Sequence, residues 1–255
     1  MPSPEFDVIF ARTQEERRAV QALRYDVFVT ELGGDGPMID HVNGLEKDQF
    51  DPFSMYLMLL DRTRGDDISQ QLVGAYRLMD QSGATRAGGF YSAKEFDLTP
   101  LTSVPIKLLE LGRSCLHIEY RGGTAMYHLW SALARYVFEQ RIDILFGVAS
   151  FQGTDSKQLE APLRLLHDRH LAPEDLRPIA QDPSIVPLDQ QGGQIDRKSA
   201  MTQIPALIKA YLRLGGYIGQ GAYLDHAFNT TDVCLVLDVA QISEKQRKFY
   251  LMERT

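Results

Sequence analysis

The sequence has few of the residues and runs that mark secreted or membrane-spanning proteins. Only two cysteines, Cys115 and Cys234, occur among 255 residues, each inside an apolar stretch. Two isolated cysteines indicate buried thiols of a cytosolic protein rather than a disulfide framework or a metal site. No apolar run approaches the ~20 residues that a membrane-spanning helix needs. The start, MPSPEFDVIF, lacks a basic segment followed by an apolar one, so we expect no signal peptide.

Positive charge and nucleotide-binding motifs are also scarce. The net charge is −7, whereas nonspecific nucleic-acid binding usually accompanies a basic excess, so we expect no nucleic-acid partner. No G-x-G-x-x-G opens a helix after a strand and no G-x-x-x-x-G-K-[ST] occurs, which leaves dinucleotide and P-loop chemistry unsupported. The composition, 44% hydrophobic and 24% charged, is that of an ordinary globular protein with a full core.

Hydrophobic periodicity and turn residues predict an alternation of strands and helices. Thr13 and Glu16 form a capping box ahead of a helix that carries Val20, Leu23, Val27 and Phe28 on one face. Strands are predicted at 7–11, 55–61, 72–79, 108–117 and 143–151, helices at 124–141, from Asp155 to about His170 and from Pro205 to Gly215, and a final hairpin around 229–232. This order predicts an α/β or α+β fold in a single domain over 1–255. Residues 172–200 form an irregular excursion, which in a compact domain is usually functional or disordered.

One predicted strand is interrupted at its centre. In LLELGRSCLH, residues 108–117, leucines that favour burial are separated by Glu110, Gly112 and Arg113. A buried charge costs several kcal/mol unless it is paired or functional. Residues 110 and 113 point to opposite faces of a regular strand, but a bulge at Gly112 re-aims side chains and frees backbone N–H groups for an oxyanion hole. The alternative is a structural ion pair of Glu110 with Arg113 or Arg77.

Several stretches together resemble the acyl-homoserine-lactone autoinducer synthases. They are LRYDVFVTEL, DQFD, LVGAYRLM and ELGRSCLHIEYRGG, at 23–32, 48–51, 72–79 and 110–123. The residues that carry the resemblance are Arg24, Phe28, Asp48, Asp51, Arg77, Glu110 and Arg113. The sequence is more similar, over nearly its whole length, to the bacterial L-ornithine Nα-acyltransferases of ornithine-lipid synthesis. GVASFQGTD (147–155) and IPALIKAYLRLGG (204–216) resemble later segments of that family.

This resemblance implies a GCN5-related N-acetyltransferase (GNAT) fold, with a central mixed sheet flanked by helices as in the autoinducer synthases. It also implies that the enzyme uses a 3-hydroxyacyl group carried on acyl carrier protein. The acyl-CoA loop of the fold, Q/R-x-x-G-x-G/A, survives only as Arg121 to Ala125, RGGTA. A carrier-protein thioester does not need the CoA pyrophosphate site, so we expect no cofactor beyond the phosphopantetheine of the donor.

Attack of an amine on a thioester requires a deprotonated amine, a polarised carbonyl and near-attack geometry. An α-ammonium group titrates well above pH 7, so a positioned base is useful. We assign Glu110 as this base and Arg113 as its catalytic neighbour. The resemblance assigns the substrate-binding residues Arg24, Phe28, Asp48, Asp51 and Arg77. His41, near the acidic loop, is added to them as a candidate that assists proton transfer, with an ordinary turn histidine as the alternative. The acid pair suits a cationic acceptor, and the sequence lacks the histidine or cysteine spacing of a metal site.

The expected acyl-donor residues lie on the interrupted strand, before the helix that follows it and on the next strand. They are Gly112, Ser114, Arg121, Gly122, Gly123, Ser150 and Phe151. Glycines before a helix N-terminus offer amides to a phosphate, here that of phosphopantetheine. Lys157, Arg164, Lys209 and Arg213 are candidates to face the acidic carrier protein. The basic terminal stretch, EKQRKFYLMERT, is either a solvated helix or a contact with an acidic partner or anionic membrane.

We therefore predict a cytoplasmic N-acyltransferase, with a peripheral membrane contact as an extension. It transfers a 3-hydroxyacyl group from acyl carrier protein to the α-amine of L-ornithine and gives lyso-ornithine lipid. Three alternatives stay open: the same reaction on glutamine, an autoinducer synthase that uses S-adenosylmethionine, and a non-catalytic carrier-protein-binding module.

Overall fold

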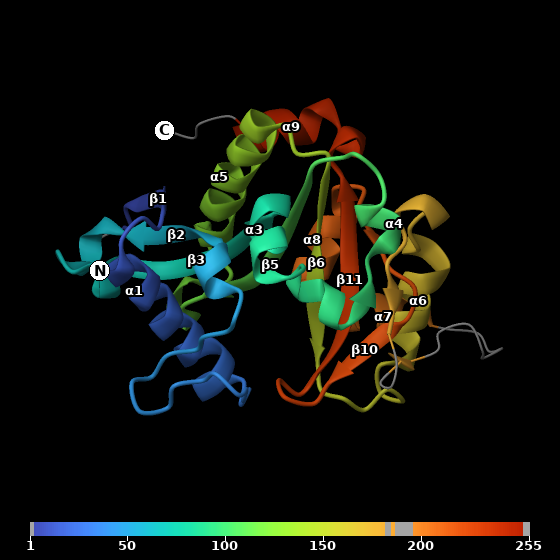
Figure 1. Ribbon diagram of the computed structural model, residues 1–255, viewed down its shortest axis with the longest axis horizontal. Coiled ribbons are helices and arrows are strands. Elements are labelled where there is room, and N and C mark those ends of the chain that lie inside the picture. Colours follow the sequence, from blue (N-terminus) through green and yellow to red (C-terminus); the bar gives the residue numbers. More distant parts are fainter. Residues whose placement is uncertain (1–2, 182–184, 187–195, 252–255) are drawn as a thin grey trace. The chain divides into compact units, whose positions relative to one another are not determined.

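The computed structural model describes residues 3–181, 185–186 and 196–251, which divide into two compact units (Figure 1). Unit 1 comprises Met1–Ala87, Leu111–Arg141 and Glu244–Thr255, and unit 2 comprises Gly88–Glu110 and Ile142–Ser243. Strand β5 (Leu108–Leu116) belongs to both, because the boundary falls between Glu110 and Leu111. The expectation of a single domain over 1–255 stays a prediction.

Unit 1 contains the strands β1 (Phe6–Phe10), β2 (Met55–Asp61), β3 (Leu72–Asp80) and the later part of β5, in that order across the sheet. The β1–β2 and β2–β3 pairs are antiparallel. Its helices are α1 (Gln14–Arg24), α2 (Ile68–Gln71), α3 (Gln81–Ala87), α5 (Ala125–Gln140) and α9 (Glu244–Leu251). The predicted strands at 7–11, 55–61 and 72–79 and the helix at 124–141 are confirmed to within one residue at each end.

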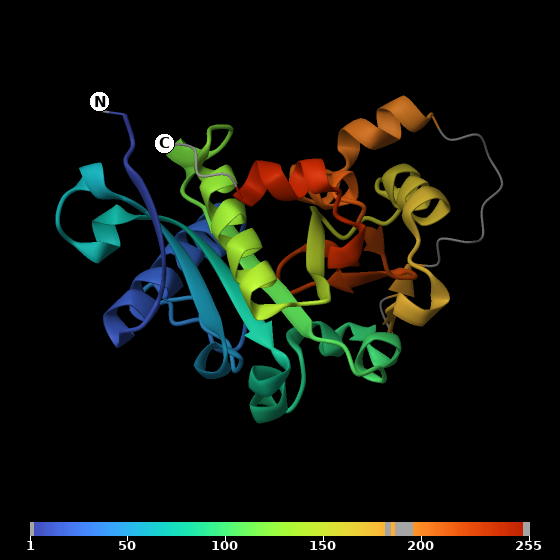
Figure 2. The ribbon, with the colours of Figure 1, turned by 90° about the horizontal axis from the view of Figure 1, so that it is seen from above.

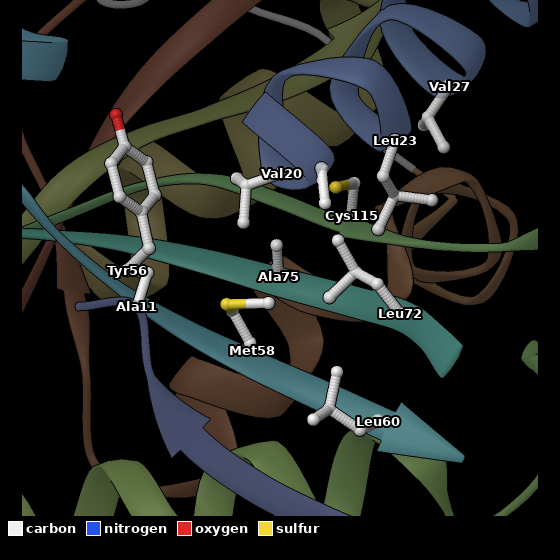
Figure 3. Close-up of a cluster of buried hydrophobic side chains, with 11 residues drawn as sticks. Ala11, Val20, Leu23, Val27, Tyr56, Met58, Leu60, Leu72, Ala75 and Cys115 are labelled. Carbon is white, nitrogen blue, oxygen red and sulfur yellow. The ribbon is translucent and has the colours of Figure 1, made fainter. Parts of the chain in front are cut away.

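The sheet of unit 1 is buried on both faces, which explains the unbroken apolar run of β2. Met58 and Leu60 contribute to a core with Val20 and Leu23 of α1, as Figure 3 shows. Leu59 points to the other face, where α5 runs across the strands (Figure 2). A strand covered by helices on both sides cannot alternate apolar and polar residues.

Helix α1 begins as predicted and then changes its winding. Thr13 accepts a hydrogen bond from the Glu16 amide, and the Glu16 carboxylate accepts one from the Thr13 amide. After Arg24 the chain continues as a π-helix over Tyr25–Glu31. This segment is rich in aromatic and β-branched residues, which lose side-chain freedom in an α-helix. The predicted helical face through Phe28 is therefore present, but its last part is π-helical.

Unit 2 contains the first three residues of β5, which pair in parallel with β6 (Ile144–Gln152). Strand β11 (Thr230–Asp238) is antiparallel to β6 and to β10 (Ala222–Asp225), and β10 pairs with β8 (Ile185–Val186). The short strand β9 (Tyr217–Ile218) also pairs with β11, and β4 (Phe96–Asp97) pairs with β7 (Ile179–Ala180). Apart from β4 and β7, which form a separate two-stranded sheet, the described strands form the mixed sheet that the sequence predicts.

The helices of unit 2 are α4 (Thr99–Thr102), α6 (Glu160–His170), α7 (Arg197–Gln203) and α8 (Ala206–Arg213). The predicted start of α6 at Asp155 is wrong, because Asp155 instead accepts hydrogen bonds in a turn from the Lys157 amide and the Gln158 side chain. Helix α8 follows Pro205 as predicted. Of the predicted excursion at 172–200, residues 182–184 and 187–195 lie outside the described residues.

Short helical turns connect these elements. They are Asp51–Phe53, Arg62–Arg64, η4 (Tyr91–Lys94), Ile118–Tyr120, Glu174–Leu176 and Val239–Gln241. In unit 1, α9 packs on α5 through contacts between Tyr127 and Phe249 and between Trp130 and Tyr250. Among the described residues, no helix combines the length and apolar character needed to cross a bilayer.

Candidate active site

Three arginines and three acids form a closed ring of ion pairs in unit 1. Arg24, at the end of α1, is fully buried and pairs with Glu46 and, at 2.8 Å, with Asp51. Both carboxylates approach within hydrogen-bonding distance of its guanidinium. The apolar face of α1 therefore ends in a cation that is held inside the protein, not in one that reaches solvent.

Arg77 and Arg113 complete the ring from strands β3 and β5. Arg77 Nη1 lies 2.5 Å from Asp48 Oδ2 and 3.4 Å from Asp51 Oδ1. Arg113 Nε lies 3.2 Å from Glu46 Oε1, and its Nη2 lies 3.3 Å from Asp48 Oδ2. Each acid thus bridges two arginines and each arginine bridges two acids. Their formal charges cancel, which is the condition under which buried charges are tolerated.

The electrostatics of the ring follow from burial and pairing. Burial raises the pKa of the Asp48 carboxyl, but Arg77 and Arg113 outweigh this effect, so its pKa lies well below the usual range. Burial likewise opposes the charged form of Arg24, yet Glu46 and Asp51 keep its pKa above the usual value. Burial raises the pKa of Tyr56, whose hydroxyl donates to Asp51 at 2.6 Å. Asp48 and Arg24 are therefore charged at neutral pH, whereas the Tyr56 phenol beside them is neutral.

In strand β5, the residue with a positive backbone φ is Arg113 and not Gly112. Arg113 has a φ of 50°, a left-handed conformation that is uncommon for a residue with a side chain. Gly112 is not in this region, but a Cβ atom there would lie 3.8 Å from Arg77 Nη2. The positive φ of β5 thus lies at Arg113, which makes two ion pairs, and the expected bulge at Gly112 stays a prediction.

Glu110 lies on the part of β5 that belongs to unit 2. Its carboxylate accepts backbone hydrogen bonds from Tyr91 at 2.9 Å and from Ser92 at 2.6 Å, and only 4% of the residue is exposed. Two amide donors stabilise a carboxylate charge and fix its direction. The Glu110 carboxylate is therefore held in one orientation by main-chain donors of the η4 turn. Its role as base stays a prediction.

The remaining predicted residues occupy varied positions. Phe28 packs against the core of unit 1, while His41 lies exposed in a loop, with its ring nitrogens 3.1 Å from Tyr25 Oη and 3.3 Å from Asp35 Oδ1. The ring of ion pairs therefore contains five of the predicted residues but neither of these two. The Arg121 guanidinium pairs with Glu31 at 2.8 Å.

The predicted donor residues are divided between the units. Gly112 and Ser114 lie on β5 in unit 1, and Gly122 and Gly123 are exposed before α5. Ser150 and Phe151 lie on β6 in unit 2, where Ser150 is exposed and Phe151 is buried. Adjacent strand residues face opposite sides, so only one of these last two can share the sheet face of Glu110.

The amino-acid sequence is similar to that of named enzymes. It is 52% identical over 245 residues to an L-ornithine Nα-acyltransferase of Rhodobacter capsulatus, covering 96% of this chain and 94% of the relative. An L-ornithine Nα-acyltransferase of Brucella abortus is 36% identical over 96% of this chain and 88% of its own length. The chain belongs to the L-ornithine Nα-acyltransferase family. It is thus an acyltransferase, as predicted.

The fold agrees with this family assignment. The Acetyltransferase (GNAT) domain model matches residues 23–131. FeeM, an N-acyl amino acid synthase from uncultured soil microbes, matches with a TM-score of 0.51 and 12% identity over 93% of this chain and 92% of its own. BjaI, a CoA-dependent acyl-homoserine lactone synthase, gives a TM-score of 0.52 and 13% identity over 96% and 88% of the two chains. These likenesses confirm the predicted fold class.

Two features of this family member were missed by the sequence analysis. Glu46 completes the ring, and the signal was present in the density of acids in GLEKDQFD, where only the pair at 48 and 51 was selected. In unit 2, Glu95, Asp225 and Asp232 bring carboxylate oxygens within 4.8 Å of one another. No local sequence pattern predicts this acid group, because its three members come from a turn and from two different strands.

The pKa shift of Asp48 predicts how stability depends on pH. Its folded-state pKa is lowered, so its contribution is complete above the unfolded pKa of about 4 and is lost as the pH falls toward the folded value. Asp48→Asn should lower the free energy of unfolding by about 1.5–3 kcal/mol at pH 7. It should also weaken the fall of stability below about pH 4.

Urea unfolding at several pH values measures both effects. The surface variant Asp168→Asn serves as control, because Asp168 is an exposed acid of α6. A pH slope for Asp48→Asn equal to that of the parent chain would show that the ring does not hold Asp48 in its charged form.

Proposed function

We propose that this chain transfers a 3-hydroxyacyl group from the phosphopantetheine thioester of acyl carrier protein to the α-amine of L-ornithine, giving lyso-ornithine lipid. The observation that carries this proposal is the 52% identity, over 96% of the chain, to a protein named L-ornithine Nα-acyltransferase. The autoinducer-synthase alternative has less support, since BjaI is only 13% identical. The identities of the donor, the acyl group and the acceptor are tested by the assay described below.

The proposed reaction forms one bond and breaks one. The neutral α-amine of ornithine attacks the thioester carbonyl, the C–N bond forms, and collapse of the tetrahedral intermediate breaks the C–S bond. The amine loses one proton and the leaving phosphopantetheine thiolate gains one. We assign proton removal to Glu110, whose carboxylate is oriented by the Tyr91 and Ser92 amides.

The ring of ion pairs supports a positioning role for its acids. Asp48 and Asp51 each bridge two arginines, so they hold Arg77 and Arg113 in fixed orientations. A guanidinium pair held in this way is suited to a carboxylate, because arginine binds planar anions through two parallel hydrogen bonds. We propose that this guanidinium pair of unit 1 binds the acceptor's α-carboxylate, with Asp48 and Asp51 as the acids that position it.

The donor assignment rests on the loop before α5. The CoA-type motif is reduced to RGGTA, and the Arg121 guanidinium already pairs with Glu31. This leaves exposed glycine amides, which suit one phosphopantetheine phosphate better than a pyrophosphate. No further cofactor is part of the proposal. Lys157, Arg164, Lys209 and Arg213 stay candidates for the carrier-protein contact.

We extend the proposal to a cytoplasmic enzyme in peripheral contact with an anionic membrane. Helix α9 carries Lys245 and Lys248, and its Phe249 and Leu251 are 44% and 40% exposed. Basic and apolar side chains on one short helix are typical of interfacial attachment. Co-sedimentation of the full chain with phosphatidylglycerol vesicles tests this extension, and equal recovery with neutral vesicles would contradict it.

The proposed function predicts both product and donor. The purified chain, supplied with 3-hydroxyacyl carrier protein and L-ornithine, should give Nα-(3-hydroxyacyl)ornithine by mass spectrometry. The same acyl group on CoA should give a much lower kcat/KM, because the CoA loop is incomplete. Equal kcat/KM for the two donors would restore an ordinary CoA enzyme. Faster acylation of glutamine would show that glutamine, not ornithine, is the acceptor. Formation of a lactone from S-adenosylmethionine would show that the chain is an autoinducer synthase.

The assignment of Glu110 predicts a loss of rate that exceeds any loss of folding. Glu110→Gln keeps the size of the side chain but cannot accept a proton near neutral pH. If Glu110 is the base, the single-turnover rate of the folded enzyme should fall on the order of 10²–10⁴-fold. The melting temperature should fall only moderately, because the amide oxygen can still accept one backbone hydrogen bond.

Melting temperature and rate must be measured on the same samples. The control is Glu174→Gln, an exposed residue of unit 2. Activity that follows the folded fraction would assign Glu110 a structural role only. A stable Glu110→Gln enzyme with near-normal turnover would remove it from the mechanism.

A further inference from the structure

The ring of ion pairs leaves one requirement of the acceptor unmet. Ornithine carries a second ammonium group on its side chain, and a buried ammonium needs carboxylates close to it. Asp48 and Asp51 each face two arginines. If the proposed function is correct, the acids that recognise the side chain are to be sought elsewhere among the described residues.

Unit 2 contains a compact group of acids. Glu95, Asp225 and Asp232 each place a carboxylate oxygen within 4.8 Å of the other two. Glu95 and Asp232 are only 4% and 3% exposed, and Asp225 is half-buried. One oxygen of Asp225 accepts hydrogen bonds from the Ala227 and Phe228 amides, which fixes this carboxylate at the end of β10. The group is therefore built into the fold rather than spread over a solvated surface.

Strand register brings this group to the sheet face of Glu110. Glu110 pairs with Phe146, which pairs with Val236 on β11. Cys234 and Asp232 follow Val236 at intervals of two residues, so their side chains point to the same face. The neighbouring strand β10 places Tyr223 directly opposite Asp232 and Asp225 two residues further. The proposed base and the acid group thus share one face of the sheet of unit 2.

The segment that covers this face supplies an independent polar group. Ser92 donates its amide to Glu110 and is fully buried. Within the described part of the chain, its hydroxyl oxygen has no hydrogen-bond partner. Glu95 follows η4 as its C-terminal cap, and its amide donates to the Ser92 carbonyl oxygen at 3.1 Å. Side chains three residues apart in such a turn stand above one another. The hydroxyl is therefore directed to the side of the turn that carries Glu95, and its lone pairs suit an N–H donor.

The titration of neighbouring groups agrees with a negative environment. The pKa of Tyr223 is raised by burial and then by Glu95, Asp225 and Asp232. The pKa of Cys234 is raised by burial and then by Glu110 and Glu95. Both groups resist ionisation because they are buried and, to a smaller extent, because carboxylates lie close to them on this face.

We propose that Glu95, Asp225 and Asp232, together with the Ser92 hydroxyl, bind the side-chain ammonium of the diamino acid acceptor. This inference rests on the proposed function. A primary ammonium has three N–H donors and matches a small group of oxygens. These residues would select ornithine against acceptors of equal length with an uncharged side chain, while Glu110 removes the proton from the α-amine.

Binding without an acyl donor tests the site separately from catalysis. Calorimetry of the full chain should detect L-ornithine far more strongly than L-norvaline, which has the same carbon chain without the side-chain ammonium. Asp225→Asn and Glu95→Gln should each weaken ornithine binding on the order of 10–100-fold and leave norvaline unchanged. The ratio of kcat/KM for ornithine over norvaline should fall by a similar factor. The control is Asp168→Asn, which should behave like the parent chain.

Asp232 is almost fully buried, so Asp232→Asn can lose binding because it does not fold, and melting curves distinguish this from a loss of the site. The half-buried Asp225 is therefore the residue on which the test depends. Ornithine should raise the melting temperature of the parent chain and not that of Asp225→Asn. Unchanged discrimination in folded Asp225→Asn and Glu95→Gln would overturn the inference. A second result would also overturn the inference. If Ca²⁺ or Mg²⁺ raised the melting temperature and added ornithine did not reduce this effect, the acid group would be a metal site.

The outcomes also separate this inference from the proposed function. If the parent chain makes acylornithine but the folded variants keep their preference, only the assignment of the acid group fails. If the parent chain acylates no amino acid, the proposed function fails, whereas the donor-free binding comparison still decides whether the acid group holds an ammonium.

Discussion

The ring of ion pairs in unit 1 requires its segments to be in place together. Arg24 cannot stay ionised inside the protein without Glu46 and Asp51, and these acids lie in a loop with little regular structure of its own. The same acids bind Arg77 and Arg113, so helix α1, the loop and strands β3 and β5 are tied to one set of charges. Removing an acid leaves an uncompensated cation, which costs about 3–5 kcal/mol where that cation is fully buried, as Arg24 is.

The ring also explains the interruption of β5. An arginine in the left-handed region is unfavourable on its own, but the two ion pairs of Arg113 offset this cost. Glu110, three residues earlier, is stabilised by different means, through the backbone amides of Tyr91 and Ser92. One strand thus presents a cation neutralised by side chains and an anion oriented by main-chain donors. This difference supports different roles, with positioning proposed for the ring and proton transfer for Glu110.

The two acid groups differ in the same way. Asp48 and Asp51 are balanced by arginines, whereas Glu95, Asp225 and Asp232 are brought together by a turn and by paired strands on the sheet face of Glu110. Their carboxylate oxygens lie within 4.8 Å of one another, a spacing that suits a ligand with several N–H donors. This arrangement gives the proposed acceptor a place for its second amino group.

Local chemistry within the sequence was enough to determine the capping box at Thr13, the helix after Pro205 and the main strands, because periodicity and capping act over a few residues. The resemblance of short stretches also led to five ring residues and to the family. The π-helical turn after Arg24, the late start of α6 and the left-handed Arg113 were decided by packing and pairing with distant segments. Glu46 joins Arg113 across 67 residues, and Glu95 meets Asp232 only through the folded sheet. Such contacts depend on strand register and loop paths, which no local pattern encodes.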